Sequence, residues 1–189
     1  MRWTWLGAVG VVCLLVAGVS SSAQAGEGTL SEAEVESLRD VAFVPVDRIN
    51  EFVKILDRRE KQIDTLLAKR WYPGRPQDLH DLMAEVGALA DELTDNLDEY
   101  DKKHRDVRKA LPKLVLATER WSTSLRAPAD DGAYNVERKL ALDTLKDMRE
   151  EAEQMETEQT AYFKAHPEAE KAEKERAEHP HATSGDGPG

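Results

Sequence analysis

Apolar residues recur three or four positions apart along most of the chain, a spacing that predicts α-helices. No run of β-branched residues alternates with polar ones, so no strand is predicted. The clearest pattern begins near Gln77 and has the heptad spacing of a helix that packs along its length against neighbours. Its apolar members are Leu79, Leu82, Val86, Leu89, Leu93, Tyr100 and Val107. We expect this helix to continue until Pro112 breaks or kinks the chain near Leu111.

The remaining periodic segments predict helices on both sides of this one. Ser31 and Glu34 match a capping box and predict a short helix that reaches about Phe43. Longer helices are predicted over about 46–70, 111–125 and 134–165, with connections at 71–76 and 127–132 where proline and glycine gather. Short loops between long amphipathic helices predict successive antiparallel neighbours. The expected fold is therefore all-α, an up-and-down antiparallel bundle of about four long helices with a short N-terminal helix.

The two ends of the chain differ from this central region. Arg2, the apolar run 6–19 and the small residues before Ala25 match a Sec-type signal peptide, so we expect cleavage after Ala25. The helical bundle domain is then expected over 26–166. Residues 167–189 form a polar C-terminal extension, predicted as a charged helix without an apolar stripe, followed by a disordered tail. This organisation predicts a periplasmic or secreted protein of a bacterial envelope, with no transmembrane segment after cleavage.

Charge and cysteine content exclude several classes of function. The chain has a net charge of −11, and loss of Arg2 with the signal takes it to −12, so phosphate repels it and nucleic acid is not an expected partner. The single cysteine, Cys13, lies within the predicted signal, which leaves no thiol for catalysis or disulfides. Basic residues cluster over 102–109 near the expected end of the third helix, where they suit its dipole or a peripheral contact with acidic lipid.

Candidate chemistry is sparse. Asp101 and His104 lie three apart on the expected third helix, and with Glu99 they are the candidate metal ligands. A row of acidic residues follows the heptad seam at Glu85, Glu92, Glu99 and Asp106. We interpret this row as a set of partners for basic residues of a neighbouring helix.

Three functional hypotheses follow from these residues. The leading one is a non-enzymatic protein-interaction or scaffold module that binds an unknown protein partner or itself. The alternative is a protein that binds a metal or small ligand in the interior or on the acidic face of the bundle. No cofactor and no catalytic residue are predicted, because the sequence contains no nucleophile turn and no phosphate loop. Tyr100 beside His104 is where an enzymatic site would be sought.

Overall fold

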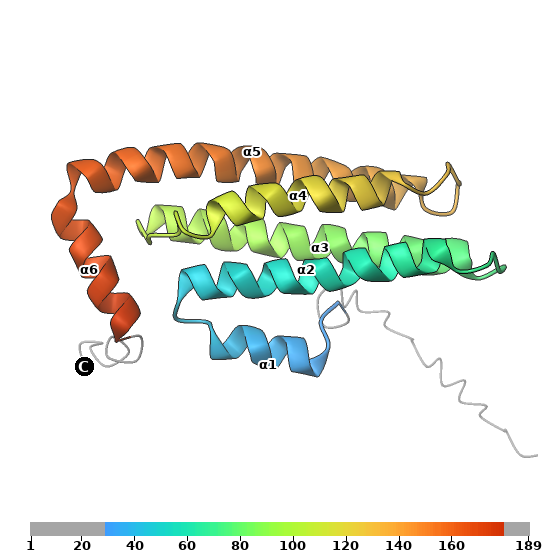
Figure 1. The fold of residues 1–189 in the computed structure, drawn as a ribbon, viewed down its shortest axis with the longest axis horizontal. Helices are drawn as coiled ribbons and strands as arrows, with labels where there is room; N and C mark the ends of the chain where they lie inside the picture. Colours follow the sequence, from blue (N-terminus) through green and yellow to red (C-terminus); the bar gives the residue numbers. More distant parts are fainter. Residues whose placement is uncertain (1–28, 180–189) are drawn as a thin grey trace, which may run out of the picture.

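The computed structural model describes residues 29–179, which form six helices (Figure 1). In chain order these are α1 (Glu32–Asp40), α2 (Pro45–Ala68), α3 (Arg75–Lys102), α4 (Leu111–Arg126), α5 (Asn135–Ala165) and α6 (Pro167–Glu178). No strand occurs within residues 29–179, and the predicted all-α class is confirmed. The predicted signal peptide and the tail from residue 180 lie outside the described residues. Within the described part of the chain, no helix is both long and apolar enough to cross a membrane.

Helices α2 to α5 run along a common axis in alternating directions, which confirms the up-and-down antiparallel bundle (Figure 1). Helix α3 packs mainly against α5 and α2, and α4 packs against the same two helices. Consequently α3 and α4 occupy opposite corners of the bundle, although they follow one another in the chain. The expectation that successive helices are neighbours holds for α2–α3 and α4–α5 but is wrong for α3–α4.

Residues 103–110 connect α3 to α4 across the diagonal of the bundle, and we call them the crossover loop. The prediction that the heptad helix continues to Val107 is wrong, because α3 ends at Lys102. Val107 is still fully buried, but it joins the hydrophobic core from the loop. Pro112 lies in the first turn of α4, a position that needs no backbone donor, so it begins a helix instead of kinking one.

The end of α3 is a Schellman motif built around a histidine. The backbone N–H of Arg105 donates to the carbonyl of Tyr100 (2.8 Å), and that of His104 donates to the carbonyl of Asp101 (2.9 Å). His104 has φ 48°, a left-handed conformation in which glycine is usual and other residues are strained. Because the position holds histidine, the usual glycine signal for a helix end is missing from the sequence.

Gln159 of α5 holds the crossover loop against the bundle. Its side-chain oxygen accepts from the backbone N–H of Val107 (3.1 Å), and its side-chain nitrogen donates to the carbonyl of Arg105 (3.1 Å). Gln159 is 4% exposed, so these two hydrogen bonds form away from solvent, where an unpaired peptide group is costly. One buried amide thereby satisfies both a donor and an acceptor of the loop backbone.

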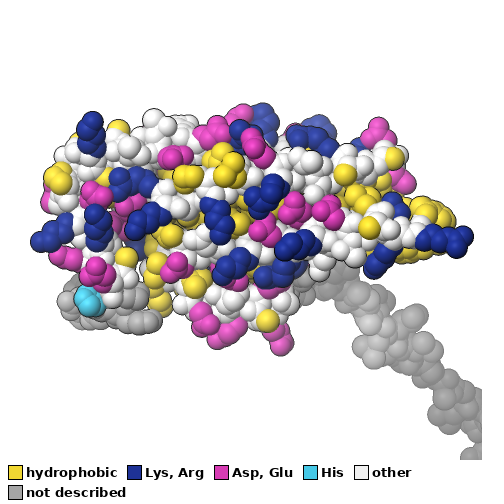
Figure 2. Space-filling view, viewed as in Figure 1, with side chains coloured by type: hydrophobic (Ala, Val, Ile, Leu, Met, Phe, Trp, Pro, Cys, Tyr) yellow, Lys and Arg dark blue, Asp and Glu magenta, His cyan; other side chains and the backbone are white. Residues whose placement is uncertain are grey.

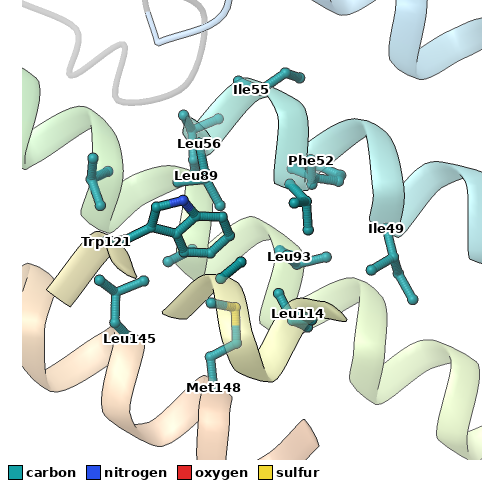
Figure 3. Close-up of a cluster of buried hydrophobic side chains, with 14 of the residues drawn as sticks. Ile49, Phe52, Ile55, Leu56, Leu89, Leu93, Leu114, Trp121, Leu145 and Met148 are labelled. Atoms are coloured by element: carbon teal, nitrogen blue, oxygen red, sulfur yellow. The ribbon is translucent and has the colours of Figure 1, made fainter. Parts of the chain in front are cut away.

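The core consists of large apolar side chains from all four bundle helices (Figure 3). Trp121 of α4 points into it, near Leu56, Leu89 and Met148. Its indole N–H nevertheless reaches the carboxylate of Asp57 on α2 (2.8 Å), so the buried ring keeps its polar partner. Apolar packing therefore extends across α2, α3, α4 and α5.

Helices α3 and α5 approach closely at Gly87. A methyl group placed there would lie 3.7 Å from Cα and 3.8 Å from Cβ of Ala141, an ordinary van der Waals contact. Alanine therefore fits at this position, whereas a longer side chain meets the backbone of α5. Glycine within a helix costs about 0.5–1 kcal/mol relative to alanine, because it has more freedom to lose on folding.

We therefore predict that Gly87→Ala stabilises the protein by about 0.5–1 kcal/mol, as measured by urea unfolding. Gly87→Leu is the matched control: it has a good helix propensity but must push α3 away from α5, and it is expected to lower stability. A loss of stability with alanine would contradict the packing described at Ala141.

Candidate functional site

A groove of about 1060 Å³ lies between α1, α2 and the first half of α3. It is more open to solvent than enclosed. Partly buried leucines form an apolar strip within it, namely Leu30 before α1, Leu66 on α2 and Leu82 on α3. Polar and charged residues of both signs surround this strip, among them Gln62, Lys69, Asp78 and Asp81.

A buried ion-pair network lies at the bottom of the groove and attaches α1 to the bundle. The guanidinium of Arg59 on α2 donates to both carboxylate oxygens of Glu34 on α1 (3.0 and 2.9 Å). It also donates to Glu85 on α3 (2.6 Å) and to the carbonyl of Thr29 (2.8 Å). Arg58 adds two further hydrogen bonds to Glu34. Arg59 and Glu34 are 7% and 6% exposed, so α1 is held by charges that solvent barely reaches.

Glu34 combines this role with the capping box predicted from the sequence. The Ser31 hydroxyl accepts from the backbone N–H of Glu34, and the Ser31 backbone N–H donates to the Glu34 carboxylate. Burial alone would raise the pKa of Glu34, but hydrogen bonds from Arg59, the Ser31 backbone and Arg58 lower it to about 2. The capping box was predicted correctly, whereas the pairing with α2 was missed because no spacing in the sequence relates Glu34 to Arg59.

The acidic row of α3 behaves as predicted at two of its four members. Glu85 pairs with Arg59, and Glu92 lies 3.9 Å from the guanidinium of Arg48, so both face α2. Glu99 instead pairs with Lys103 one turn along (2.6 Å). Asp106 lies in the crossover loop and binds Arg108 (2.7 Å), which follows from the early end of α3.

The three candidate metal ligands lie at the end of α3. Asp101 and His104 line a small cavity of about 210 Å³ together with Glu158 and Tyr162 of α5, whereas Glu99 does not. The His104 ring stacks on Tyr162, with 4.3 Å between the ring centroids. Within residues 29–179, no three His, Cys, Asp or Glu side chains are grouped so that they could hold a metal ion. A metal at Asp101 and His104 stays a prediction.

Neither the groove nor the end of α3 contains a recognisable catalytic arrangement among the described residues. The groove lining includes no histidine, and its two serines are engaged: Ser31 caps α1 and the Ser37 hydroxyl donates to the Glu34 carbonyl (3.0 Å). Tyr100 is buried, and burial raises the pKa of its hydroxyl, so the hydroxyl stays protonated near neutral pH.

An acidic pair between α5 and α3 was not foreseen from the sequence. One carboxylate oxygen of Glu151 is buried and has no hydrogen-bond partner within the described residues. Burial, and then repulsion from Asp98, Asp101 and Asp95 on α3, raise the pKa of Glu151 to about 7. Above that pH Glu151 carries a charge that forms no ion pair within residues 29–179.

Comparison with known proteins gave no match to any family model, to any curated protein or to any solved structure.

The Glu34 network predicts a loss of stability in acid. Its carboxylate has a pKa of about 2 in the folded chain against 4.5 unfolded, so the associated stability is complete above pH 4.5 and disappears as the pH falls towards 2. Glu34→Gln should cost about 3 kcal/mol at pH 7 in urea unfolding and should flatten the acid dependence. Glu36→Gln on the exposed face of α1 is the control, and an equal loss there would contradict this account.

The Glu151 carboxylate predicts the opposite dependence on pH. Since its folded pKa of about 7 lies above the unfolded 4.5, its contribution is most favourable below pH 4.5 and is lost as the pH rises through 7. Glu151→Gln should raise the free energy of unfolding by about 1–3 kcal/mol at pH 8.5 and have little effect at pH 4.5. Glu150→Gln, one residue away and exposed, should leave both values unchanged.

Proposed function

We propose that the chain is an exported, non-enzymatic protein-interaction module that binds a segment of a partner protein in the groove between α1, α2 and α3. The open form of the groove is the observation on which this proposal depends. Small-ligand sites usually enclose most of the ligand's surface, whereas this groove covers one side of what it binds. A helix or extended segment of another protein meets that requirement.

The chemistry of the groove lining supports the same occupant. Its strip of three leucines suits an apolar row on one face of the bound segment. The flanking charges are of both signs, which favours a partner with mixed charges that fix its orientation. The buried Arg59–Glu34 network supports the groove from below and keeps α1 in place when the groove is empty. Export by the residues 1–25 would place the partner in the envelope or outside the cell.

Site-specific crosslinking tests the proposal. A photoreactive amino acid at Gln62, which lies in the groove and is exposed, should give a discrete crosslinked product in cells of the source organism. The same amino acid at Glu150 on α5, outside the groove, is the matched control.

A charge introduced into the groove shows whether the crosslinked product depends on binding there. Leu82→Glu should reduce the Gln62 product at least several-fold, while Leu116→Glu on the exposed face of α4 should not. Crosslinking that is equal at Gln62 and Glu150, or insensitive to Leu82→Glu, would contradict the proposal. A product with twice the mass of the chain would identify a second copy as the occupant.

A further inference from the structure

Helix α6 is attached to the bundle by charge and buries no apolar side chain. Of its residues, Pro167–Glu178, the only buried one is Glu173. The helix turns away from the end of α5 at His166 and lies across the end of the bundle (Figure 1). The sequence predicted a solvated charged helix, without an apolar stripe that could dock it strongly. The structure shows where it docks, which is on the crossover loop.

Two arginines of the crossover loop bind two carboxylates of α6. The Arg105 guanidinium donates to Glu173 (2.9 Å), and that of Arg108 donates to Glu170 (3.1 Å). The backbone N–H of Asp106 also donates to Glu173 (3.3 Å). Glu170 and Glu173 lie three residues apart, which places both on one face of the helix. The crossover loop therefore recognises a pair of carboxylates one turn apart.

The two guanidinium groups are positioned by the bundle as well as by α6. Arg108 lies over the ring of Phe163 on α5, 4.6 Å from its centroid, and also binds Asp106. Arg105 reaches the carbonyl of Phe43 between α1 and α2 (3.5 Å). The backbone N–H of Val107 and the carbonyl of Arg105 itself are held by Gln159. Such contacts hold the arginines in place independently of α6, and preorganised arginine forks bind carboxylates well.

A cavity of about 700 Å³ remains beneath α6. It is bordered by Val44 and Val46 at the start of α2, by Arg105 and Arg108, and by Glu170 and Ala177 of α6. Val44 and Val46 are therefore only partly buried beside α6. Positive and negative side chains are interspersed at this end of the molecule (Figure 2). A better-fitting helix could use both the arginines and the space that α6 leaves empty.

We infer that the crossover loop is a docking site for an acidic helix of a partner protein, with two carboxylates one turn apart, and that α6 occupies this site until the partner displaces it. This surface shares no lining residue with the groove, and the inference does not depend on the groove. The contacts of α6 show which arrangement of carboxylates the loop binds, namely two that lie one turn apart on a helix. An apolar residue of the partner, facing Val44 and Val46, would fill the cavity that α6 spans.

The first experiment tests whether α6 is released. In the full chain, Glu170→Gln with Glu173→Gln removes both carboxylates that bind the loop. Amide hydrogen exchange of residues 168–178 should then accelerate, while that of α3 and α5 stays unchanged. Glu168→Gln with Glu175→Gln alters the same helix by the same charge, but neither carboxylate has a contact with the bundle among the hydrogen bonds and ion pairs of the structure. Unchanged exchange in the first variant, or equal exchange in both, would overturn the inference.

The second experiment tests whether the vacated loop binds an acidic helix. The probe is a synthetic peptide of residues 166–179, and binding is measured by NMR shifts of the Arg105 and Val107 amides in the full chain. The Glu170→Gln/Glu173→Gln chain should bind it about tenfold more tightly than the parent chain, whose own α6 occupies the site. A peptide with glutamine at both positions should not bind, and salt should weaken the acidic one.

The remaining outcomes are equally decisive. If the acidic peptide does not bind the variant in which α6 is released, the loop is no docking site. If inorganic phosphate or anionic vesicles shift the same amides and the peptide does not, the site binds anions and the inference about a partner helix is wrong. If the parent chain forms dimers by light scattering and the Glu170→Gln/Glu173→Gln chain does not, the acidic helix that the loop binds is α6 of a second copy, and the inference about a partner protein is wrong.

Discussion

The rest of the structure depends on how the chain crosses from one corner of the bundle to the opposite one. The crossover loop brings backbone groups into an apolar environment, where they would be costly if left without partners. Gln159 supplies partners for two of these groups through its two hydrogen bonds. Val107, in the same loop, adds its apolar side chain to the core. The loop fixed in this way connects α3 to α4, which packs against α2 and α5. The loop also positions the arginines that bind α6.

Hydrophobic packing and ion pairs stabilise different parts of this molecule. The four long helices are joined by an apolar core, whereas α6 and, in large part, α1 are attached by arginine–glutamate pairs. In both cases the arginine belongs to the bundle or its loop, and the glutamate belongs to the peripheral helix. The strength of each attachment depends on exposure: Arg59 is almost completely buried, while Arg105 and Arg108 are about one-fifth to one-quarter exposed. Ion pairs weaken as solvent reaches them, so α6 is the more easily released of the two.

Local patterns in the sequence predicted the elements well and their connections less well. The apolar heptads located α3, and the Ser31 capping box located the start of α1, because both depend on residues close together in the chain. The end of α3 was misplaced because His104 occupies a position where glycine would have signalled a Schellman motif, and because Val107 continues the heptad spacing after the helix has ended. The Arg59–Glu34 network and the approach of Glu151 to Asp98 could not be predicted from the sequence, since each depends on helices that meet only in the folded structure.

The diagonal path has a consequence for the order in which the protein can fold. A growing chain that has completed α3 offers that helix only α2, because its principal partner, α5, comes last among the four. The apolar stripe of α3 is therefore half-covered until the chain has been extended to about residue 165. Early hairpins of neighbouring helices cannot complete this core, so closure of the bundle is a late and cooperative event that needs nearly the whole domain. During that interval the exposed stripe is apolar surface of the kind that promotes aggregation.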